Sequence, residues 1–381
     1  MGRSAAILLC VSVAAMVALG LVMLASTSLW ATDGTGVEYA LVKRQAIWAV
    51  VGVLGAVTLA WLDYRLLRKF WIPIFLGACL LLVLCYVPGV QVWRGGAARW
   101  ISLPILGQFQ PSEAAKIAVV VALAAWFAQY QAEAGSFWRG FVIPGALLAI
   151  PTGLIFFEKD MGTAAAIGAA GFGLLYVAGT RWWGLLISGS LGFVAVAYMV
   201  MSDEVRWNRI MAFQDLEGTK LEAGAQQYYS LLGLSSGGMN GVGLGDGLMK
   251  HGSLPFAHTD FIFSTVGEEL GLVFTLAMVL CYVMITITGL SISLHAQDHF
   301  GRILGVGLTA VIIVPALMNI GVVTAMLPNT GLPLPFVSYG GSNLVFTLAA
   351  IGLLVSLHRR ARFAERAAMP VIKERKLALK I

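Results

Sequence analysis

The chain has 381 residues, of which 59% are hydrophobic and 12% are charged, and its formal net charge is +6. Because soluble domains carry about 25% charged residues, this composition excludes a soluble protein and indicates an integral membrane protein. The apolar runs are continuous, which also excludes an outer-membrane barrel, whose strands alternate apolar and polar residues.

Apolar runs along the chain predict an all-α, polytopic membrane protein with about ten transmembrane helices, because a hydrocarbon core of about 30 Å requires roughly 20 apolar residues per helix. We place the spans at approximately 5–30, 44–62, 70–88, 111–131, 138–157, 162–180, 182–201, 261–293, 301–327 and 342–358. The first run is too long for the core of a signal peptide, so we interpret it as a membrane helix. The division between the sixth and seventh spans depends only on Thr180 and Arg181.

Basic residues predict the orientation, since Lys and Arg favour cytoplasmic loops near helix ends. With both termini in the cytoplasm, the inner side carries Arg3, Arg65, Arg68, Lys69, Arg139, Arg181, Arg302 and the basic residues of the tail. Residues 1–358 then form the membrane domain, and 359–381 form a basic cytoplasmic tail. This topology accounts for the net positive charge, so we predict no nucleic-acid partner.

The longer connections share the outer side in this orientation. They are 89–110, 158–160, 328–341 and the large extracytoplasmic loop 202–260 between the seventh and eighth helices. A loop as long as 202–260 is usually functional or partly helical, and residues 226–234 are typical of a short interfacial helix. We therefore expect the functional groups to face outward.

Arg99 precedes the motif Gln110-Pro-Ser-Glu113-Ala-Ala-Lys116. The proline and Glu113 suit the first turn of a helix, and Glu113 and Lys116 share one helix face. Two interpretations stay open. The pair is a structural ion pair in a capped helix, or it forms a polar cluster with Arg99 that binds an anionic head group, for which the planar guanidinium is suited.

Three polar residues further along the outer side also have two interpretations. Asp160 suits the N-cap of the span that it opens, or it contacts a pyrophosphate or a cation together with Lys159. Arg209 follows a span, so it snorkels to the interface or binds an anion. Gln226 is a polar group suited to sugar hydroxyls.

Residues 237–247 are rich in glycine. No strand precedes them and the lysine of a phosphate-binding loop is missing, so we predict no nucleotide site. Tight turns, or a close approach of the main chain to a substrate, suit the pattern better.

His258-Thr259-Asp260 stands at the threshold of the eighth span, with Glu268 and Glu269 two turns further in. Capping of the helix by Thr259 or Asp260 is the structural alternative. It leaves the two glutamates unexplained, because unpaired carboxylates at membrane depth cost several kcal/mol. Ionisable groups at such positions are usually functional, so we predict that Asp260 carries the chemistry.

The segment before the last span combines three prolines with three glycines and includes Ser338 and Ser342. Prolines impose a non-helical path. Irregular backbone at membrane depth is tolerated where it is buried in protein or lines a polar cavity. We therefore expect a re-entrant loop that lines a site.

Taken in order, these motifs resemble the SEDS family (shape, elongation, division and sporulation proteins), the cell-wall polymerases typified by FtsW and RodA. The matching residues are Arg99-Trp100-Ile, Gln110-Pro-Ser-Glu113, Asp160-Met-Gly-Thr163, Gln226, the glycines of 237–247, His258-Thr-Asp-Phe-Ile-Phe263, Glu268-Glu269-Leu-Gly and 331–342. Two departures are Glu158-Lys159, where the family more often has Gln-Pro, and Gln227-Tyr-Tyr after Gln226. Residues 20–28 look more like the division (FtsW-like) branch than the elongation branch.

The resemblance implies a peptidoglycan glycosyltransferase that polymerises lipid II on the outer face of the bacterial cytoplasmic membrane, for cell division or elongation. Asp260 corresponds to the family's essential aspartate, and we expect it to deprotonate the acceptor sugar while polyprenyl pyrophosphate leaves. The candidate substrate-binding residues are Arg99, Glu113, Lys116, Asp160, Arg209, Gln226, His258, Thr259, Ser338 and Ser342. Among these, Arg99, Lys116 and Arg209 are expected to neutralise the pyrophosphate.

The expected partners are a class B penicillin-binding protein, which is a transpeptidase, and other divisome or elongasome membrane proteins. A divalent cation, Mg or Mn, is compatible with this chemistry, and no nucleotide or organic cofactor is expected. A lipid II flippase or other transporter is the alternative, but it predicts ionisable groups along a path to both faces, whereas here they crowd the outer side. A scaffold that only recruits a transpeptidase leaves Asp260 and Glu113 without a purpose.

Overall fold

The computed structural model of the protein describes residues 4–28, 40–94, 97–103, 107–250, 254 and 257–378. Several predicted features lie outside the described residues: Arg3, the end of the first predicted span at 29–30, parts of the outer loops at 95–96, 104–106, 251–253 and 255–256, and the end of the tail at 379–381.

Eight helices in the described chain are long and apolar enough to cross a membrane. They are α1 (Ser4–Ser28), α2 (Ala40–Trp61), α5 (Pro111–Gln129), α6 (Ile143–Phe157) with a π-helical turn before it (Trp138–Val142), α8 (Trp182–Met201), α11 (Ile262–Leu294), α12 (His299–Val323) and the first part of α13 (Gly341–Ala378). Two further predicted spans correspond to shorter apolar helices, α4 (Trp71–Leu84) and α7 (Met161–Val177). The multi-pass helical fold is confirmed, and the count of ten stays a prediction.

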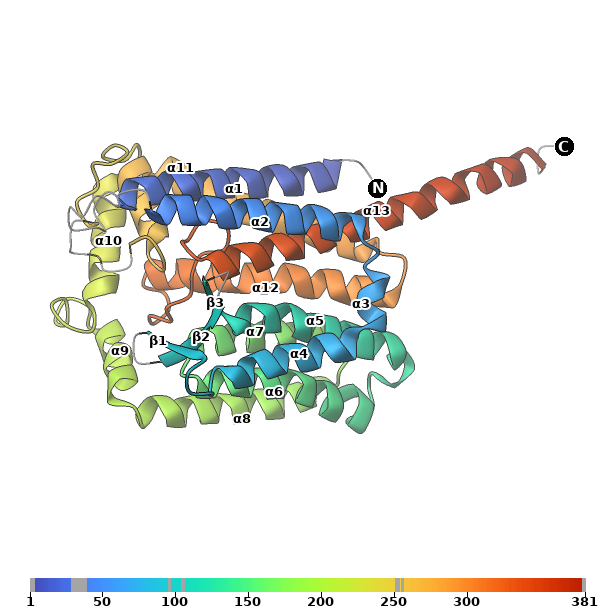
Figure 1. Ribbon diagram of the computed structural model, residues 1–381, viewed down its shortest axis with the longest axis horizontal. Helices are drawn as coiled ribbons and strands as arrows, with labels where there is room; N and C mark the ends of the chain where they lie inside the picture. Colours follow the sequence, from blue (N-terminus) through green and yellow to red (C-terminus); the bar gives the residue numbers. More distant parts are fainter. Residues whose placement is uncertain are drawn as a thin grey trace.

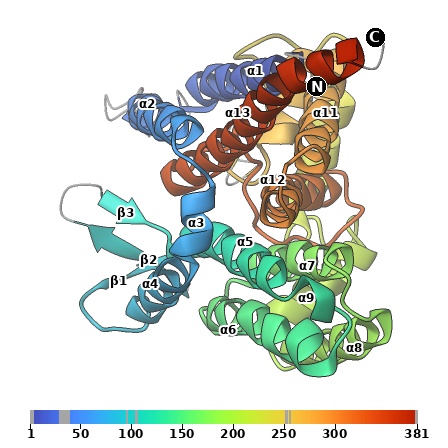
Figure 2. The same cartoon turned by 90° about the vertical axis from the view of Figure 1, so that its right-hand side faces the viewer.

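The helices form a bundle with α5 and α12 near its centre (Figure 2). Both are buried over most of their length, and α5 achieves this with alanine and valine on nearly all sides. Such an all-round apolar helix is suited to a bundle core. In contrast, α8 lies at the periphery and exposes Leu186, Phe193 and other large apolar residues, as expected of a helix that faces lipid.

The first and last parts of the chain pack together, because α2 lies along α13. Glycine makes this approach close: a Cβ on Gly352 would lie less than 3.0 Å from the main chain of Ala56, and one on Gly52 would collide with Leu348. Small residues at helix contacts are typical of membrane bundles. Beyond this contact α13 continues without a break through residue 358, where we expected the tail to begin, and projects from the bundle (Figure 1).

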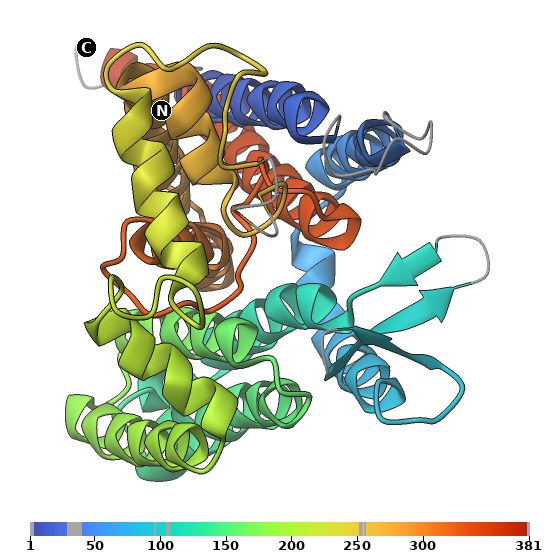
Figure 3. The same ribbon diagram turned by 90° about the vertical axis from the view of Figure 1, so that its left-hand side faces the viewer.

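The outer connections gather at the end of the bundle opposite the two termini (Figure 1). Residues 91–109 form a small antiparallel sheet of β1 (Gln91–Arg94), β2 (Ala97–Leu103) and β3 (Gly107–Phe109) in the order β1-β2-β3, an addition to the all-α expectation. Figure 3 shows this sheet beside the bundle and α9 (Glu204–Gln214) and α10 (Ala225–Gly237) across its end. The predicted interfacial helix at 226–234 is therefore present as part of α10.

The inner connections are short. They include α3 (Arg65–Lys69) between α2 and α4, and a 3₁₀ turn (Gln131–Glu133) after α5. On the outer side, α11 is interrupted near its beginning, since Gly271 has φ 80° and ψ −173°. Only residues 262–270 of this helix therefore follow Asp260 directly as one regular segment.

Candidate functional site

Asp260 lies in the turn immediately before α11, and its main chain is held from two sides. Its carbonyl accepts a hydrogen bond from Asn319 Nδ2 of α12 (2.6 Å), and the same amide donates to the carbonyl of Leu332 (2.7 Å). The preceding carbonyl, of Thr259, accepts from Ser338 Oγ (2.6 Å). That of His258 accepts from the N–H of Tyr339 (3.0 Å). Three consecutive carbonyls are thus bound to α12 and the loop 324–340.

The carboxyl group of Asp260 is not used as a helix cap. The N-cap of α11 is Phe261, and no side chain caps the helix there. Burial raises the pKa of Asp260 to about 6, and the charge of Asp160 acts in the same direction, while a hydrogen bond from Thr259 and the nearby Arg99 and Arg209 act against them. A carboxylate with such a pKa is ionised at neutral pH and accepts a proton readily, which suits a general base.

Asp160 has the helix-capping role that is one of its two predicted interpretations, and its contact with a pyrophosphate or a cation stays a prediction. It is the N-cap of α7 and accepts from the N–H of Thr163 (3.2 Å). It also accepts from Gln110 Nε2 (3.3 Å), and Arg99 Nη1 lies 3.9 Å from its Oδ1. Arg99 in turn donates to the carbonyl of Lys159 (2.5 Å). The cap therefore also lies close to the guanidinium of Arg99.

A cavity of about 700 Å³ opens beside these groups. Four cationic residues line it: Arg99, Lys159, Arg206 and Arg209. The remaining wall is largely apolar and is formed by α6, α7 and α8, with residues 328–330 of the outer loop at one side. Asp260 lies next to this loop, because a Cβ on Gly331 would be 3.5 Å from its Oδ2. The cavity therefore has a cationic part near Asp260, which we call its cationic mouth, and an apolar groove between helices.

Other predicted site residues lie elsewhere. Glu113 and Lys116 form a buried ion pair (2.8 Å) on α5, and Asn343 Nδ2 donates to the glutamate (3.3 Å). Their side chains are only 3% and 5% exposed, and they are not among the residues that line the cavity. This arrangement favours the structural interpretation of the pair.

The remaining predicted residues hold the irregular loop before α13 in place. Gln226 of α10 accepts from Asn329 Nδ2 (2.6 Å). Ser338 Oγ accepts from the N–H of Leu334 (2.7 Å), in addition to its bond to Thr259, and Ser342 Oγ accepts from the N–H of Gln110 (3.1 Å). His258 is partly buried, and burial lowers the pKa of its imidazole. Gln226, Ser338 and Ser342 therefore shape the site by hydrogen bonds to other parts of the protein.

Sequence reasoning missed three residues of this region. Asn319 was hidden in the apolar run of α12, although a lone amide there is itself a signal. Gln45 of α2 binds the loop through Ser338 O and the N–H of Gly340 (both 3.2 Å). Arg206 also lines the cavity and was given no place in the site, whereas Lys159, for which a pyrophosphate or cation contact is one of the predicted interpretations, lines it as well.

Glu158 is an unusual neighbour of this cluster. Both of its carboxyl oxygens are buried without a hydrogen-bond partner. Burial raises its pKa to about 8, and the charge of Asp160 adds to the effect. At neutral pH Glu158 is therefore mostly a neutral acid, which limits the negative charge beside Asp160 and Arg99.

The described residues contain no group of three or more His, Cys, Asp and Glu side chains that could hold a metal ion. The carboxylates of Asp160 and Asp260 do lie close enough to influence each other. Magnesium is usually bound through one or two carboxylates together with substrate phosphates, so a cation that arrives with a phosphorylated substrate stays a prediction.

Comparison with known proteins gives consistent matches over almost the whole chain. A family model described as "Cell cycle protein" (FtsW, RodA and SpoVE) matches residues 6–363. The "Probable peptidoglycan glycosyltransferase FtsW" of Geobacter metallireducens is 38% identical over 349 residues, covering 91% of this chain and 93% of that protein. Stage V sporulation protein E of Bacillus subtilis is 33% identical and covers 91% and 95% of the two chains.

Solved structures match as well. The crystal structure of the rod shape determining protein RodA of Thermus thermophilus has a TM-score of 0.67 and 29% identity, covering 92% of this chain and 95% of that one. A chain from a structure entitled "Structural coordination of polymerization and crosslinking by a peptidoglycan synthase complex" has a TM-score of 0.75 and 29% identity, covering 93% and 97%.

Proposed function

The chain belongs to the FtsW, RodA and SpoVE family of cell cycle proteins, and from this premise we propose that it is a peptidoglycan glycosyltransferase that polymerises lipid II on the outer face of the bacterial cytoplasmic membrane. The observation that carries the proposal is the position of Asp260, a carboxylate with a pKa of about 6 beside a cavity with a cationic mouth and an apolar groove. The similarity to proteins named FtsW favours a role in division.

The cavity suits a substrate that is half lipid and half polar. Arginine binds phosphate oxygens through its planar fork, so Arg99 and Arg209 are placed to hold the pyrophosphate of a lipid-linked donor, with Lys159 and Arg206 nearby. The apolar wall between α6, α7 and α8 then follows the polyprenyl chain toward the membrane. Lys116 has no part in this, because it is buried against Glu113.

In the proposed reaction Asp260 removes the proton of the acceptor sugar's 4-hydroxyl. The oxygen attacks the anomeric carbon of the donor, the bond from that carbon to the pyrophosphate oxygen breaks, and polyprenyl pyrophosphate leaves. The configuration at the anomeric carbon is inverted in the new glycosidic bond. Asp260 then releases the proton to water. A positioned base contributes roughly 10²–10⁴-fold, and the remainder comes from holding both reactants and stabilising the leaving charge.

A divalent cation also belongs to this proposal. Asp160 and Asp260 would hold it together with pyrophosphate oxygens, and its chemistry would be to neutralise charge on the leaving group. Without the metal ion, the cationic side chains that line the cavity neutralise part of the charge on the leaving group.

A class B penicillin-binding protein is the partner that we propose. The match to a peptidoglycan synthase complex supports it. That complex coordinates polymerisation with crosslinking, and a transpeptidase partner would supply the crosslinking. Apolar side chains on the outer surfaces of α8 and α11 provide membrane-embedded faces on which a single-pass helix can lie.

The test is polymerisation of labelled lipid II by the purified protein together with its penicillin-binding partner. We expect glycan strands from the wild type and none from Asp260→Ala, with Glu217→Gln, an exposed acidic residue of the outer segment, matching the wild type. Equal activity of wild type and Asp260→Ala would refute the role of Asp260 as base. If the wild type makes no strands with Mg or Mn present but moves lipid II across vesicle membranes, the transporter alternative replaces the proposal.

A further inference from the structure

At the interruption of α11, two carbonyls accept hydrogen bonds from outside the helix. In a continuous helix the carbonyls of Glu268 and Glu269 would accept from N–H groups four residues on. Here the glycine-rich segment 238–243 provides the partners instead. Three main-chain hydrogen bonds join them: Val242 N to Glu268 O (2.9 Å), Gly243 N to Glu269 O (3.1 Å) and Leu272 N to Gly238 O (3.0 Å).

Glycine is required for this contact. A Cβ on Gly237 or Gly241 would lie less than 3.0 Å from the main chain of α11, and Gly241 has a φ of +76°. The glycine run therefore packs against the broken helix rather than against a substrate. It ties residues 262–270, the segment that begins just after Asp260, to the loop that leads toward Asp260.

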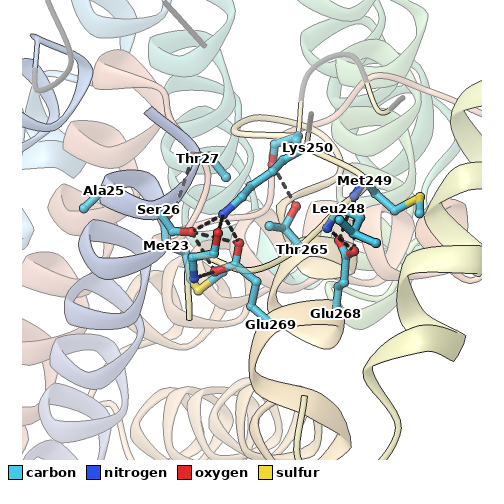
Figure 4. A network of polar contacts seen from close by, with 12 residues as sticks. Met23, Ala25, Ser26, Thr27, Leu248, Met249, Lys250, Thr265, Glu268 and Glu269 are labelled. Carbon is cyan, nitrogen blue, oxygen red and sulfur yellow. Dashed lines mark hydrogen bonds and ion pairs between the residues drawn. The ribbon is translucent and has the colours of Figure 1, made fainter. Parts of the chain in front are cut away.

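Side chains reinforce the same connection. Lys250 Nζ lies 2.6 Å from Glu269 Oε1 and also donates to Ser26 Oγ (2.9 Å) and the carbonyl of Gly245 (2.7 Å). Glu269 Oε2 accepts from the N–H of Gly245 (2.9 Å) and from Ser26 Oγ (2.6 Å). Figure 4 shows the lysine reaching down from the loop between α1 and the glutamate. The ion pair is 1% and 0% exposed.

Glu268 performs a parallel task one residue earlier. Its carboxylate accepts from the N–H groups of Leu248 (2.6 Å) and Met249 (3.1 Å). The carboxylate oxygens of both glutamates thus accept hydrogen bonds from the loop 245–250, so neither glutamate is free to bind a substrate. The lysine is equally occupied, with three acceptors for its three protons.

We propose that Lys250 and Glu269 are positioning residues, which fix the short helix 262–270 so that Asp260, just before it, stays at its working place beside the cavity. The inference rests on the proposed function. The loop continues from Lys250 to Asp260 within ten residues, and Thr265 Oγ1 reaches back to the carbonyl of Ala257 (3.5 Å). Asp260 is therefore held by α12 and the loop 324–340 on one side and by the Lys250–Glu269 pair on the other.

The test compares lipid II polymerisation by Lys250→Met and by the double variant Lys250→Met/Glu269→Gln in the full chain with its partner. The second change removes the carboxylate charge that the first leaves buried and unpaired, so the double variant recovers thermal stability. Since misplacement of about 1 Å can cost 10²-fold, we expect both variants to lose roughly 10–100-fold in kcat with KM within about twofold. Asp246→Asn, an exposed acidic residue of the same loop, is the matched control.

Each other result overturns the inference. If the double variant regains both stability and wild-type kcat, the pair only supports folding. If KM rises while kcat is kept, the pair contacts substrate. If Asp246→Asn behaves like Lys250→Met, the loop and not the ion pair is responsible. A wild type that makes no glycan strands is a separate failure, that of the proposed function, and it removes the reaction for which the positioning would matter.

Discussion

Two groups of carboxylates at the outer end of α11 look alike in the sequence and differ in their surroundings. The oxygens of Glu268 and Glu269 are occupied by main-chain N–H groups, Ser26 and Lys250. At Asp260 the protein binds the main chain instead, through Asn319 and its neighbours, and leaves the carboxyl beside a cationic cavity. A buried acid whose oxygens are saturated holds structure, whereas one whose main chain is fixed and whose carboxyl lies against the loop that borders a cavity is available for chemistry.

The largest effects are expected when one acid from each group is neutralised, which tests whether Asp260 serves catalysis and Glu268 serves stability. Asp260→Asn should lower kcat by roughly 10²–10⁴-fold, the contribution typical of a positioned base, with little change in thermal stability. Glu268→Gln should lower the unfolding temperature, because it loses charge-assisted hydrogen bonds to Leu248 and Met249. Polymerisation kinetics and thermal unfolding of both variants decide this, and the opposite assignment of the two effects would contradict the comparison.

A second prediction concerns stability. Lys250→Met should cost about 3–5 kcal/mol of unfolding free energy, since it leaves Glu269 buried without its counter-ion. The exposed pair of Arg65 and Asp298 at the inner end, with side chains 48% and 28% exposed, is the matched control, and Arg65→Met should cost less than about 1 kcal/mol. Chemical unfolding in detergent measures both. Equal costs would show that the outer pair is not protected from solvent as described.

A third prediction sharpens the functional side. Because Arg209 lines the cavity and lowers the pKa of Asp260, Arg209→Met should raise KM for the donor about tenfold, the loss expected for charge-assisted phosphate contacts. Lys220→Met removes a cation of the same outer segment that does not line the cavity and should change KM little. An unchanged KM in Arg209→Met would place the pyrophosphate elsewhere.

The smallest predicted effect is on pH dependence. With a pKa of about 6 for Asp260, the base is ionised above pH 6 and protonated below it. The value of kcat/KM should therefore fall as the pH drops, by roughly tenfold per unit well below the pKa. Removing the Arg209 charge raises the pKa, so the acid limb should move to higher pH in Arg209→Met. A limb that stays in place would show that Arg209 does not act on Asp260.

Local patterns sufficed for the membrane helices, because apolar runs are signals within a few residues. The outward location of function and the role of Asp260, chosen as an acid at a helix threshold, stay predictions. The pairing of Ser26 with Lys250 spans 224 positions, and no local pattern contains it. The same holds for Gln45, whose partner Ser338 lies 293 positions away, and for Asn319, whose partner Asp260 lies 59 positions away. The sheet at 91–109 escaped because two of its three strands have only four and three residues.

The supports of Asp260 also have a consequence for biosynthesis. Asn319 follows Asp260 by 59 positions and Ser338 follows Thr259 by 79, and α2 finds its neighbour α13 only when the last helix is made. While the chain leaves the ribosome, Asp260 can enter the membrane before the residues that hold it exist. A prematurely terminated protein would carry the acid without its supports, so the ability to build cell wall arrives with the final helix and not before.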